Sequence, residues 1–357
     1  MTSKSWNVIG LMSGTSLDGI DVVYVNIFKN DNTYHFNLIK TETVGYSTAW
    51  KNKLLNAFTS SKNNIEKLNI SYGNYLGDVV NNFKEKHEIS AIDFIASHGH
   101  TIFHKPNDGY TLQIGDGKSI CNTTGLKVIC DFRTQDVALG GQGAPLVPIG
   151  DELLFSTYDY CLNLGGFANI SFRKNDERIA FDICPVNIVM NHYVKELGLD
   201  FDDSGDIART GSVNENLLEE LNTISFYKKP IPKSLGFEFV KETIFPIINK
   251  YNLPVEIILR TIIAHVVIQI SSCLDNNLDS KVLVTGGGAF NIFLMEELQR
   301  YTANQIVIPE KEIVDFKEAL IFALLGVLRI ENKINCLSSV TGARKDHSSG
   351  KIFTKHS

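Results

Sequence analysis

A serine- and glycine-rich segment near the N-terminus carries the residue types that bind phosphate groups. It reads Gly10-Leu11-Met12-Ser13-Gly14-Thr15-Ser16-Leu17-Asp18-Gly19-Ile20 and joins two apolar stretches. Glycine allows close approach to the backbone, hydroxyls add hydrogen-bond donors, and successive amides in a turn can form an anion-binding nest. Asp18-Gly19 is equally typical of a tight hairpin turn, so the segment by itself fits both a phosphate loop and a structural turn.

Two further glycine loops occur later in the chain. One carries Gly165 and Gly166 between two strand-like stretches, and the other, Gly286-Gly287-Gly288, ends an apolar stretch. A single glycine in a strand often reflects only a bulge or close packing. Three such loops together predict a nucleotide-binding cleft between two halves of the chain. None of them matches the Walker pattern, or a complete G-x-G-x-x-G followed by a helix.

Two carboxylates are candidates for the chemistry of such a cleft. Asp182 ends an alternating strand-like stretch and precedes Pro185 and Asn187, so it is placed where a general base would lie. A helix cap or a turn carboxylate explains the same position equally well. Glu318 falls in the first turn of the last predicted helix, residues 316–330, where a carboxylate also suits the helix dipole. Glu318 alone therefore indicates little.

Basic and imidazole side chains follow two other strand-like stretches. The histidines are His98, His100 and His104. They could ligate a metal, but without matching carboxylates their spacing favours hydrogen bonding to a polar ligand. Arg133 could hold an anionic substrate through its planar fork of donors. An ion pair between Arg133 and Asp131 or Asp136 is the equal alternative.

The composition limits the classes of function. A chain of 357 residues that is 43% hydrophobic exceeds the usual size of a single core, so two domains are expected. The formal charge of -6 gives no basis for nucleic-acid binding. No signal peptide and no apolar run of about 18 residues is visible, so we expect a cytoplasmic protein without a membrane span. The six cysteines lack zinc-finger spacing, and we expect no structural zinc.

The order of apolar patterns predicts two halves that both begin with strands. The first half opens with strands at 8–11, 20–28 and 34–44, followed by an amphipathic helix around 65–83. Chain breakers at 140–145 end it, and new strands follow at 160–164, 168–172 and 179–183. The polar tail from Thr341 onward lacks apolar density, so we expect it to be partly mobile.

In order along nearly the whole chain, the motifs resemble those of the anhydro-N-acetylmuramic acid kinase family. The opening hairpin and the stretch 138–148 both resemble the family, and the combination of the hairpin with Gly140 to Pro148 is specific to it. The further matching segments are Ser97-His98-Gly99, Thr111-Leu112-Gln113-Ile114-Gly115, Asp131-Phe132-Arg133, 163–171, Phe181-Asp182, Pro232-Lys233-Ser234, 284–291, Glu318-Ala319 and Ser339-Val340-Thr341-Gly342-Ala343.

The resemblance implies an α/β fold with two ribonuclease-H-like domains and ATP in the cleft between them. It implies one domain of residues 1–140 plus about 312–357, and a second of residues 141–311. The first hairpin and Gly165-Gly166 would then hold phosphates, and Gly286 to Gly288 would lie on the adenosine side. The family also implies a homodimer.

The implied reaction uses ATP and Mg²⁺ to open the 1,6-anhydro bridge of 1,6-anhydro-N-acetylmuramic acid and to phosphorylate O6. N-acetylmuramic acid 6-phosphate and ADP are the products, in the recycling of peptidoglycan. Asp182 stands at the family's catalytic-base position, and His98, Arg133 and Glu318 stand at positions that contact the substrate. Asp18 and Asp182 are the candidates to hold magnesium through water.

The sequence departs from the family at three places. Ile183-Cys184-Pro185-Val186 stands where the family usually has a small or polar residue followed by Gly-Pro-Gly. Two glycines are thus replaced, and the sugar pocket is expected to change shape. His100 stands where the family often has glutamine. Met12 stands where many superfamily relatives carry a metal-associated aspartate. A kinase for another amino sugar and an ATP-regulated binding module are the alternative functions.

Overall fold

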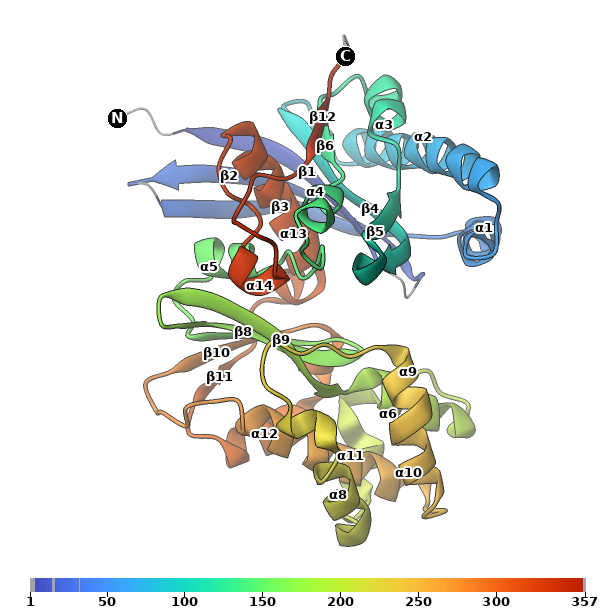
Figure 1. Cartoon of the computed structure of the whole chain (residues 1–357), viewed down its shortest axis with the longest axis vertical. Coiled ribbons are helices and arrows are strands. Elements are labelled where there is room, and N and C mark those ends of the chain that lie inside the picture. Colours follow the sequence, from blue (N-terminus) through green and yellow to red (C-terminus); the bar gives the residue numbers. More distant parts are fainter. Residues whose placement is uncertain (1–3, 15–16, 32, 356–357) are drawn as a thin grey trace. The chain divides into compact units, whose positions relative to one another are not determined.

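A computed structural model describes residues 4–14, 17–31 and 33–355 (Figure 1). The chain divides into two compact units, Met1–Leu154 with Phe316–Ser357, and Phe155–Asp315. The first boundary lies fourteen residues beyond the expected limit at residue 140. Helix α5 (Pro148–Leu154) packs within the first unit, where Asp151 forms a buried ion pair with Lys317.

The first unit contains a seven-stranded sheet in the order β12-β6-β4-β1-β2-β3, with β5 paired to β4. The first three strands form an antiparallel meander, whereas β1, β4 and β6 run parallel. The strands are β1 (Ser5–Ser13), β2 (Gly19–Asn30), β3 (Thr33–Gly45), β4 (Phe94–Lys105), β5 (Tyr110–Ile114), β6 (Val128–Cys130) and β12 (Lys351–Phe353).

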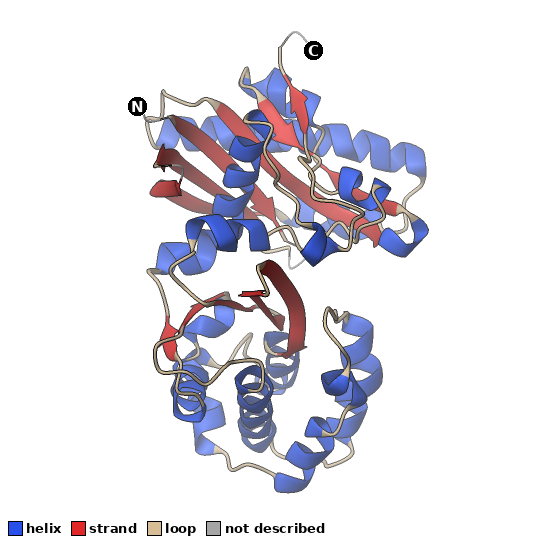
Figure 2. Cartoon of the chain, turned by 60° about the vertical axis from the view of Figure 1, so that its left-hand side comes forward, coloured by secondary structure: helices blue, strands red, loops and turns tan. Residues whose placement is uncertain are grey.

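Helices pack on both faces of this sheet (Figure 2). Ile9 and Leu11 of β1 enter the core that α2 helps to form, and Gly10 between them points to the opposite face. A Cβ at Gly10 would lie 2.3 Å from the carbonyl oxygen of Ala319 in α13. The helices assigned to this unit are α1 (Thr48–Ala57), α2 (Lys62–Lys86), α3 (Gly117–Thr124), α4 (Thr134–Ala138), α5, most of α13 (Lys311–Ile330) and α14 (Ser338–Thr341).

The second unit repeats this strand order in a five-stranded sheet, β11-β10-β7-β8-β9. Here β7, β8 and β9 are antiparallel neighbours, and β7, β10 and β11 run parallel. The strands are β7 (Tyr160–Leu164), β8 (Phe167–Lys174), β9 (Glu177–Pro185), β10 (Lys281–Thr285) and β11 (Gln305–Val307). The helices are α6 (Asn187–Val194), α7 (Asp206–Thr210), α8 (Glu215–Asn222), α9 (Phe237–Phe239), α10 (Phe245–Asn249), α11 (Val255–Ser271) and α12 (Ile292–Tyr301).

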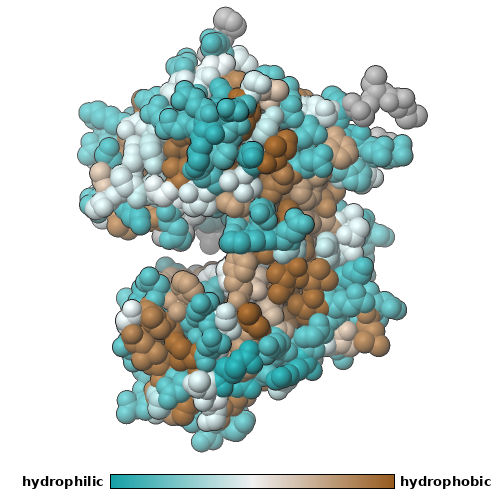
Figure 3. All heavy atoms as spheres, turned by 180° about the vertical axis from the view of Figure 1, so that it is seen from behind, coloured by the Kyte–Doolittle hydropathy of each residue, from teal (hydrophilic) through white to brown (hydrophobic). Residues whose placement is uncertain are grey.

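The repeated order confirms the predicted fold class, because both sheets place three antiparallel strands beside parallel ones in the manner of ribonuclease H. The core of the second unit gathers around α11, whose apolar residues occupy most of its circumference. Figure 3 shows apolar side chains interspersed among hydrophilic ones on the surface of each unit. Among the described residues, no helix is both long and apolar enough to cross a bilayer.

The expectation that the tail beyond Thr341 is partly mobile was wrong. Strand β12 pairs with β6, and His347 and Ser349 are buried. The side chain of Asn335 donates hydrogen bonds to the carbonyl oxygens of Leu325 and Ser349. Polar side chains therefore satisfy one another inside the first unit, which composition alone does not reveal.

Candidate active site

The predicted phosphate hairpin joins β1 to β2 in the first unit. Ser13 ends β1 and Gly19 begins β2. Leu17 has a left-handed backbone, with φ of 60°, and its N–H lies 3.5 Å from the carbonyl oxygen of Gly14. Asp18 is exposed beside it. The predicted contacts through Thr15 and Ser16 fall outside the described residues.

Gly19 and Ile20 attach the hairpin to the rest of the sheet. A Cβ at Gly19 would lie 2.6 Å from the carbonyl oxygen of Val44, and Ile20 is fully buried. Packing against β3 is thus enough to require glycine at position 19.

The hydroxyl of Ser13 belongs to a buried chain of hydrogen bonds. Its oxygen lies 2.6 Å from the hydroxyl of Tyr46 and 2.9 Å from Nδ1 of His100. Tyr46 is bonded in turn to the hydroxyl of Tyr72. Burial lowers the pKa of His100 to about 4, so the ring is neutral at pH 7. This chain fixes the side chain of Ser13 at the end of β1, next to the hairpin.

Acidification is expected to destabilise the protein through His100. Its pKa is lower in the folded state than its ordinary value of about 6.5, so the unfolded chain binds the proton first as the pH falls. The stabilisation is complete above pH about 6.5 and is lost between there and pH about 4. Denaturant unfolding gives the free energy of unfolding at pH 7 and at pH 5. The decrease between the two should be smaller in His100→Gln than in the wild type, by up to about 2 kcal/mol. An equal loss in both proteins would contradict this role.

His98 and Arg133 are in direct contact. Nε of Arg133 donates to Nε2 of His98 at 3.0 Å, and Nη1 donates to the carbonyl oxygen of Gly143 at 2.6 Å. Nδ1 of His98 lies 3.0 Å from the carbonyl oxygen of Gly99, so it must carry the proton. Burial, with the charge of Arg133 in addition, lowers the pKa of His98 well below its usual range. The ring is therefore a neutral acceptor that orients the guanidinium group.

The predicted ion pair between Arg133 and a nearby aspartate does not form. Asp131 pairs with Lys351 at 2.8 Å instead. Asp136 accepts hydrogen bonds from the N–H of Gly143 and the hydroxyl of Thr341. No described residue accepts a hydrogen bond from Nη2 of Arg133. That nitrogen is consequently available to a ligand.

Glu318 lies well inside α13, because the helix begins at Lys311 and not at residue 316 as expected. The predicted place in the first turn was therefore wrong, and the helix dipole does not explain this carboxylate. The side chain of Glu318 is exposed at the surface. Loss of hydration by the packed protein around it raises the pKa of its carboxyl, and the charges of Arg133 and Lys317 oppose that rise. Glu318 and Arg133 thus belong to one electrostatic neighbourhood.

Asp182 lies on β9 of the second unit and is held by a neighbouring loop. Its Oδ2 accepts the N–H of Leu235 at 2.8 Å, and its own N–H donates to the carbonyl oxygen of Lys233 at 2.9 Å. No donor among the described residues reaches Oδ1. Burial raises the pKa of Asp182, which the hydrogen bond from Leu235 partly opposes. Such a half-buried carboxylate with one free oxygen is suited to accept a proton.

A β-bulge next to Asp182 sets the direction of its side chain. Ala168 pairs with Cys184 and Asn169 pairs with Asp182, so Ile183 is an extra residue on β9. Bulges of this kind re-aim a neighbouring side chain. Ile183 and Cys184 are buried in the core of the unit. The departure from the family's pattern at Ile183 and Cys184 thus places apolar side chains in the core of the unit, directly after the candidate base in the sequence.

The second and third glycine loops meet at the carboxyl ends of β7 and β10. The carbonyl oxygens of Gly165 and Gly166 accept hydrogen bonds from the N–H groups at the start of α6 and of Val186 just before the helix. The side-chain nitrogen of Asn187 donates to the carbonyl oxygen of Leu164 at 3.0 Å. A Cβ at Gly288 would lie 2.7 Å from the Cβ of Leu164. Parallel strands β7 and β10 therefore bring these two predicted loops together.

Gly286→Ala is expected to destabilise this junction. Gly286 has φ of 80°, and a Cβ there would lie 2.8 Å from the backbone carbon of Leu164. Strain and overlap together should lower the free energy of unfolding by about 1–3 kcal/mol. Gly198→Ala is the matched control, because Gly198 has φ of 76° but no atom within 4 Å of the added Cβ. Equal losses in the two variants by denaturant unfolding would show that the overlap contributes nothing.

Comparison with known proteins identifies the chain. The family model for anhydro-N-acetylmuramic acid kinase matches residues 6–355. The chain belongs to the anhydro-N-acetylmuramic acid kinase family. Its relatives of that name include a protein of Aliivibrio fischeri, 35% identical, with 97% of this chain and 98% of the relative covered. One of Haemophilus influenzae is 33% identical, with 97% of both chains covered.

Membership in the anhydro-N-acetylmuramic acid kinase family confirms the resemblance seen in the motifs and makes the chain an ATP-using kinase. Within the first unit the structure joins His98 to Arg133, and within the second it joins the glycine loops. Sequence reasoning missed the clamp that Lys233 and Leu235 form on Asp182. The Pro232-Lys233-Ser234 motif was a signal that this segment matters, but it did not show what the segment contacts.

Proposed function

We propose that this chain is an ATP-dependent kinase that hydrolytically opens the 1,6-anhydro bridge of 1,6-anhydro-N-acetylmuramic acid and phosphorylates O6. The products are N-acetylmuramic acid 6-phosphate and ADP, in the recycling of cell-wall peptidoglycan. Full-length family membership supports the proposal, and the observation that carries it is the carboxylate of Asp182, with its clamped Oδ2 and free Oδ1.

Asp182 is the proposed general base. Its free Oδ1 takes a proton from the water that attacks the anomeric carbon, while the departing bridge oxygen becomes the phosphoryl acceptor. The N–H of Leu235 holds Oδ2 and so fixes the plane of the carboxylate. Burial raises the pKa of Asp182, which makes its carboxylate a stronger base.

The proposed phosphate contacts come from the hairpin between β1 and β2 and from the turn at Gly165 and Gly166. Gly286 to Gly288 are assigned to the adenosine side. The donor set suits ATP, because backbone amides in tight turns bind phosphate oxygens. Magnesium neutralises phosphate charge when it is bound. Asp18 and Asp182 supply oxygen ligands of the kind that Mg²⁺ prefers, and they would hold it through water.

Arg133 is the proposed recognition group for the lactyl carboxylate of the sugar. No described residue accepts a hydrogen bond from its Nη2, whereas Nε and Nη1 donate to His98 and to the carbonyl oxygen of Gly143. The guanidinium group is thus oriented before the sugar binds. Glu318, whose charge acts on Arg133, is proposed to contact the same sugar.

We further propose that each unit corresponds to one ribonuclease-H-like domain. The first domain is then the unit of residues 1–154 and 316–357 with the first phosphate hairpin, and the second is the unit of residues 155–315 with Asp182. The family also supports a homodimer that acts in the cytoplasm. The substrate is a small sugar, and no membrane or nucleic-acid partner is part of this function.

Release of ADP tests the proposal when three sugars are compared, 1,6-anhydro-N-acetylmuramic acid, N-acetylmuramic acid and N-acetylglucosamine. The proposal predicts rapid release with the anhydro sugar alone. Preference for another sugar would make the chain a kinase of that amino sugar. The departure from the family's pattern at the buried Ile183 and Cys184 would accord with that result. ATP binding without ADP release from any sugar would favour a regulated binding module.

A further inference from the structure

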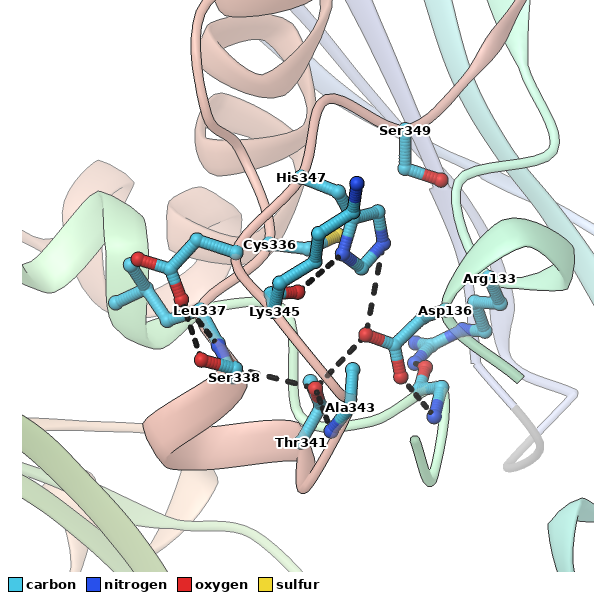
Figure 4. A network of polar contacts seen from close by, with 12 residues as sticks. Arg133, Asp136, Cys336, Leu337, Ser338, Thr341, Ala343, Lys345, His347 and Ser349 are labelled. Carbon is cyan, nitrogen blue, oxygen red and sulfur yellow. Dashed lines mark hydrogen bonds and ion pairs between the residues drawn. The ribbon is translucent and has the colours of Figure 1, made fainter. Parts of the chain in front are cut away.

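Three potential metal ligands from distant parts of the chain meet inside the first unit (Figure 4). They are Asp136 on α4, Cys336 after α13, and His347 in the C-terminal tail. One donor atom of each lies within 4.8 Å of the donor atoms of the other two, and all three residues are buried. None of them has a part in the proposed reaction.

The backbone holds two of these residues side by side. Cys336 and His347 form an isolated antiparallel bridge, in which each N–H donates to the other residue's carbonyl oxygen, at 3.1 and 3.2 Å. The carboxylate of Asp136 is fixed independently, because its Oδ2 accepts the N–H of Gly143 at 2.7 Å. The main chains of Cys336 and His347 are therefore held together, and the carboxylate of Asp136 is held separately by the N–H of Gly143 and the hydroxyl of Thr341.

The imidazole of His347 has an unpaired nitrogen in this cluster. Its Nδ1 lies 3.2 Å from the carbonyl oxygen of Lys345, which can only accept, so Nδ1 carries the proton. Nε2 lies 3.6 Å from Oδ1 of Asp136, which also accepts a hydrogen bond from the hydroxyl of Thr341, and Nε2 has no hydrogen-bond partner among the described residues. Because 3.6 Å is too long for a direct hydrogen bond, pairing Nε2 with this carboxylate requires a group bound between the two atoms.

A metal ion of the zinc class meets this requirement. Ligands at the usual Zn–N, Zn–O and Zn–S distances in a tetrahedron stand about 3.3–3.6 Å apart, close to the separation of Nε2 and Oδ1. Nδ1 donating to a backbone carbonyl, and a carboxylate held through its second oxygen, are the outer contacts typical of metal ligands. A thiol, an imidazole and a carboxylate together suit Zn²⁺ and not Mg²⁺.

We propose that Asp136, Cys336 and His347 bind one zinc-class transition-metal ion, with water in the remaining position, and that this ion fastens the C-terminal tail to α4. We expected no structural zinc because the cysteines lack zinc-finger spacing. Spacing cannot reveal this site, since it has a single cysteine and Asp136 lies about 200 residues before the other two ligands in the sequence. Asp136 also holds Gly143, whose carbonyl oxygen accepts from Arg133. The ion would thus stabilise the loop behind the candidate sugar contact.

Titration of the reduced, chelator-treated full chain with Co²⁺ tests the site, because thiolate ligation gives a charge-transfer band and tetrahedral geometry gives intense visible bands. We expect saturation at about one Co²⁺ per chain, displacement by Zn²⁺, and a higher melting temperature with metal. Cys336→Ser should abolish the thiolate band, and His347→Gln should weaken binding about tenfold or more. Cys121→Ser, which removes another buried thiol of the same unit, should change neither.

The absence of a thiolate band in the wild-type chain would overturn the proposal. A band that persists in Cys336→Ser, or is lost in Cys121→Ser, would overturn it as well. If Cys336→Ser fails to fold, the wild-type spectrum and the affinity of His347→Gln still decide. The assay measures no turnover, so its outcome is independent of the proposed kinase activity.

Discussion

Asp182→Asn is expected to lower kcat with the anhydro sugar by about 10²–10⁴-fold, while the dissociation constants for ATP and sugar stay nearly unchanged. Asparagine has the same shape and can still accept the N–H of Leu235 through its amide oxygen. It cannot take a proton from water. The measurement is steady-state ADP release combined with calorimetric binding of each ligand.

The control for this variant is Asp176→Asn, which removes an exposed carboxylate from the turn between β8 and β9. It should leave kcat unchanged. The wild-type enzyme should also lose kcat/KM on acidification around a pKa above the ordinary value of about 4 for aspartate, because burial raises the pKa of Asp182. Substantial turnover by Asp182→Asn would remove this residue from the mechanism.

Arg133→Met is expected to reduce kcat/KM for 1,6-anhydro-N-acetylmuramic acid roughly 10- to 100-fold. A hydrogen bond to a charged group contributes about 1.5–3 kcal/mol, and Nη2 is the nitrogen free to make it. Methionine keeps the unbranched apolar part of the side chain but cannot donate. Initial rates over a range of sugar concentrations give the value.

The same sugar without its lactyl group, 1,6-anhydro-N-acetylglucosamine, is the matched control for Arg133. The wild-type enzyme should use it poorly, and Arg133→Met should lower its kcat/KM much less than that of the muramic sugar. Equal losses with both sugars would mean that Arg133 acts on the shape of the site, through His98 and Gly143, and does not bind the carboxylate.

The sequence was sufficient for the features that depend on neighbouring residues. Apolar patterning predicted the meander at the start of each unit, because alternation along a strand is local. The two short glycine loops were likewise visible as breaks after β7 and β10. The start of α13 was placed too late, since Lys311 to Asp315 have no strong apolar periodicity to announce a helix.

Features that depend on contacts between distant residues could not be predicted in this way. Leu235 reaches Asp182 across 53 residues, and the bulge at Ile183 appears only in the pairing of β8 with β9. The cluster of Asp136, Cys336 and His347 requires the tail to return to α4. Each of these contacts joins residues that tertiary folding brings together, which no local pattern specifies.

The mass of the product formed from 1,6-anhydro-N-acetylmuramic acid and ATP tests the proposed function most directly. A kinase that opens the bridge with water must give a product heavier than the substrate by one phosphoryl group and one water, with one ADP formed for each product molecule. In ¹⁸O-labelled water, the label should enter the sugar and not the phosphate. A product that gains only a phosphoryl group, or ADP formed without any change in the sugar, would contradict hydrolytic phosphorylation by this chain.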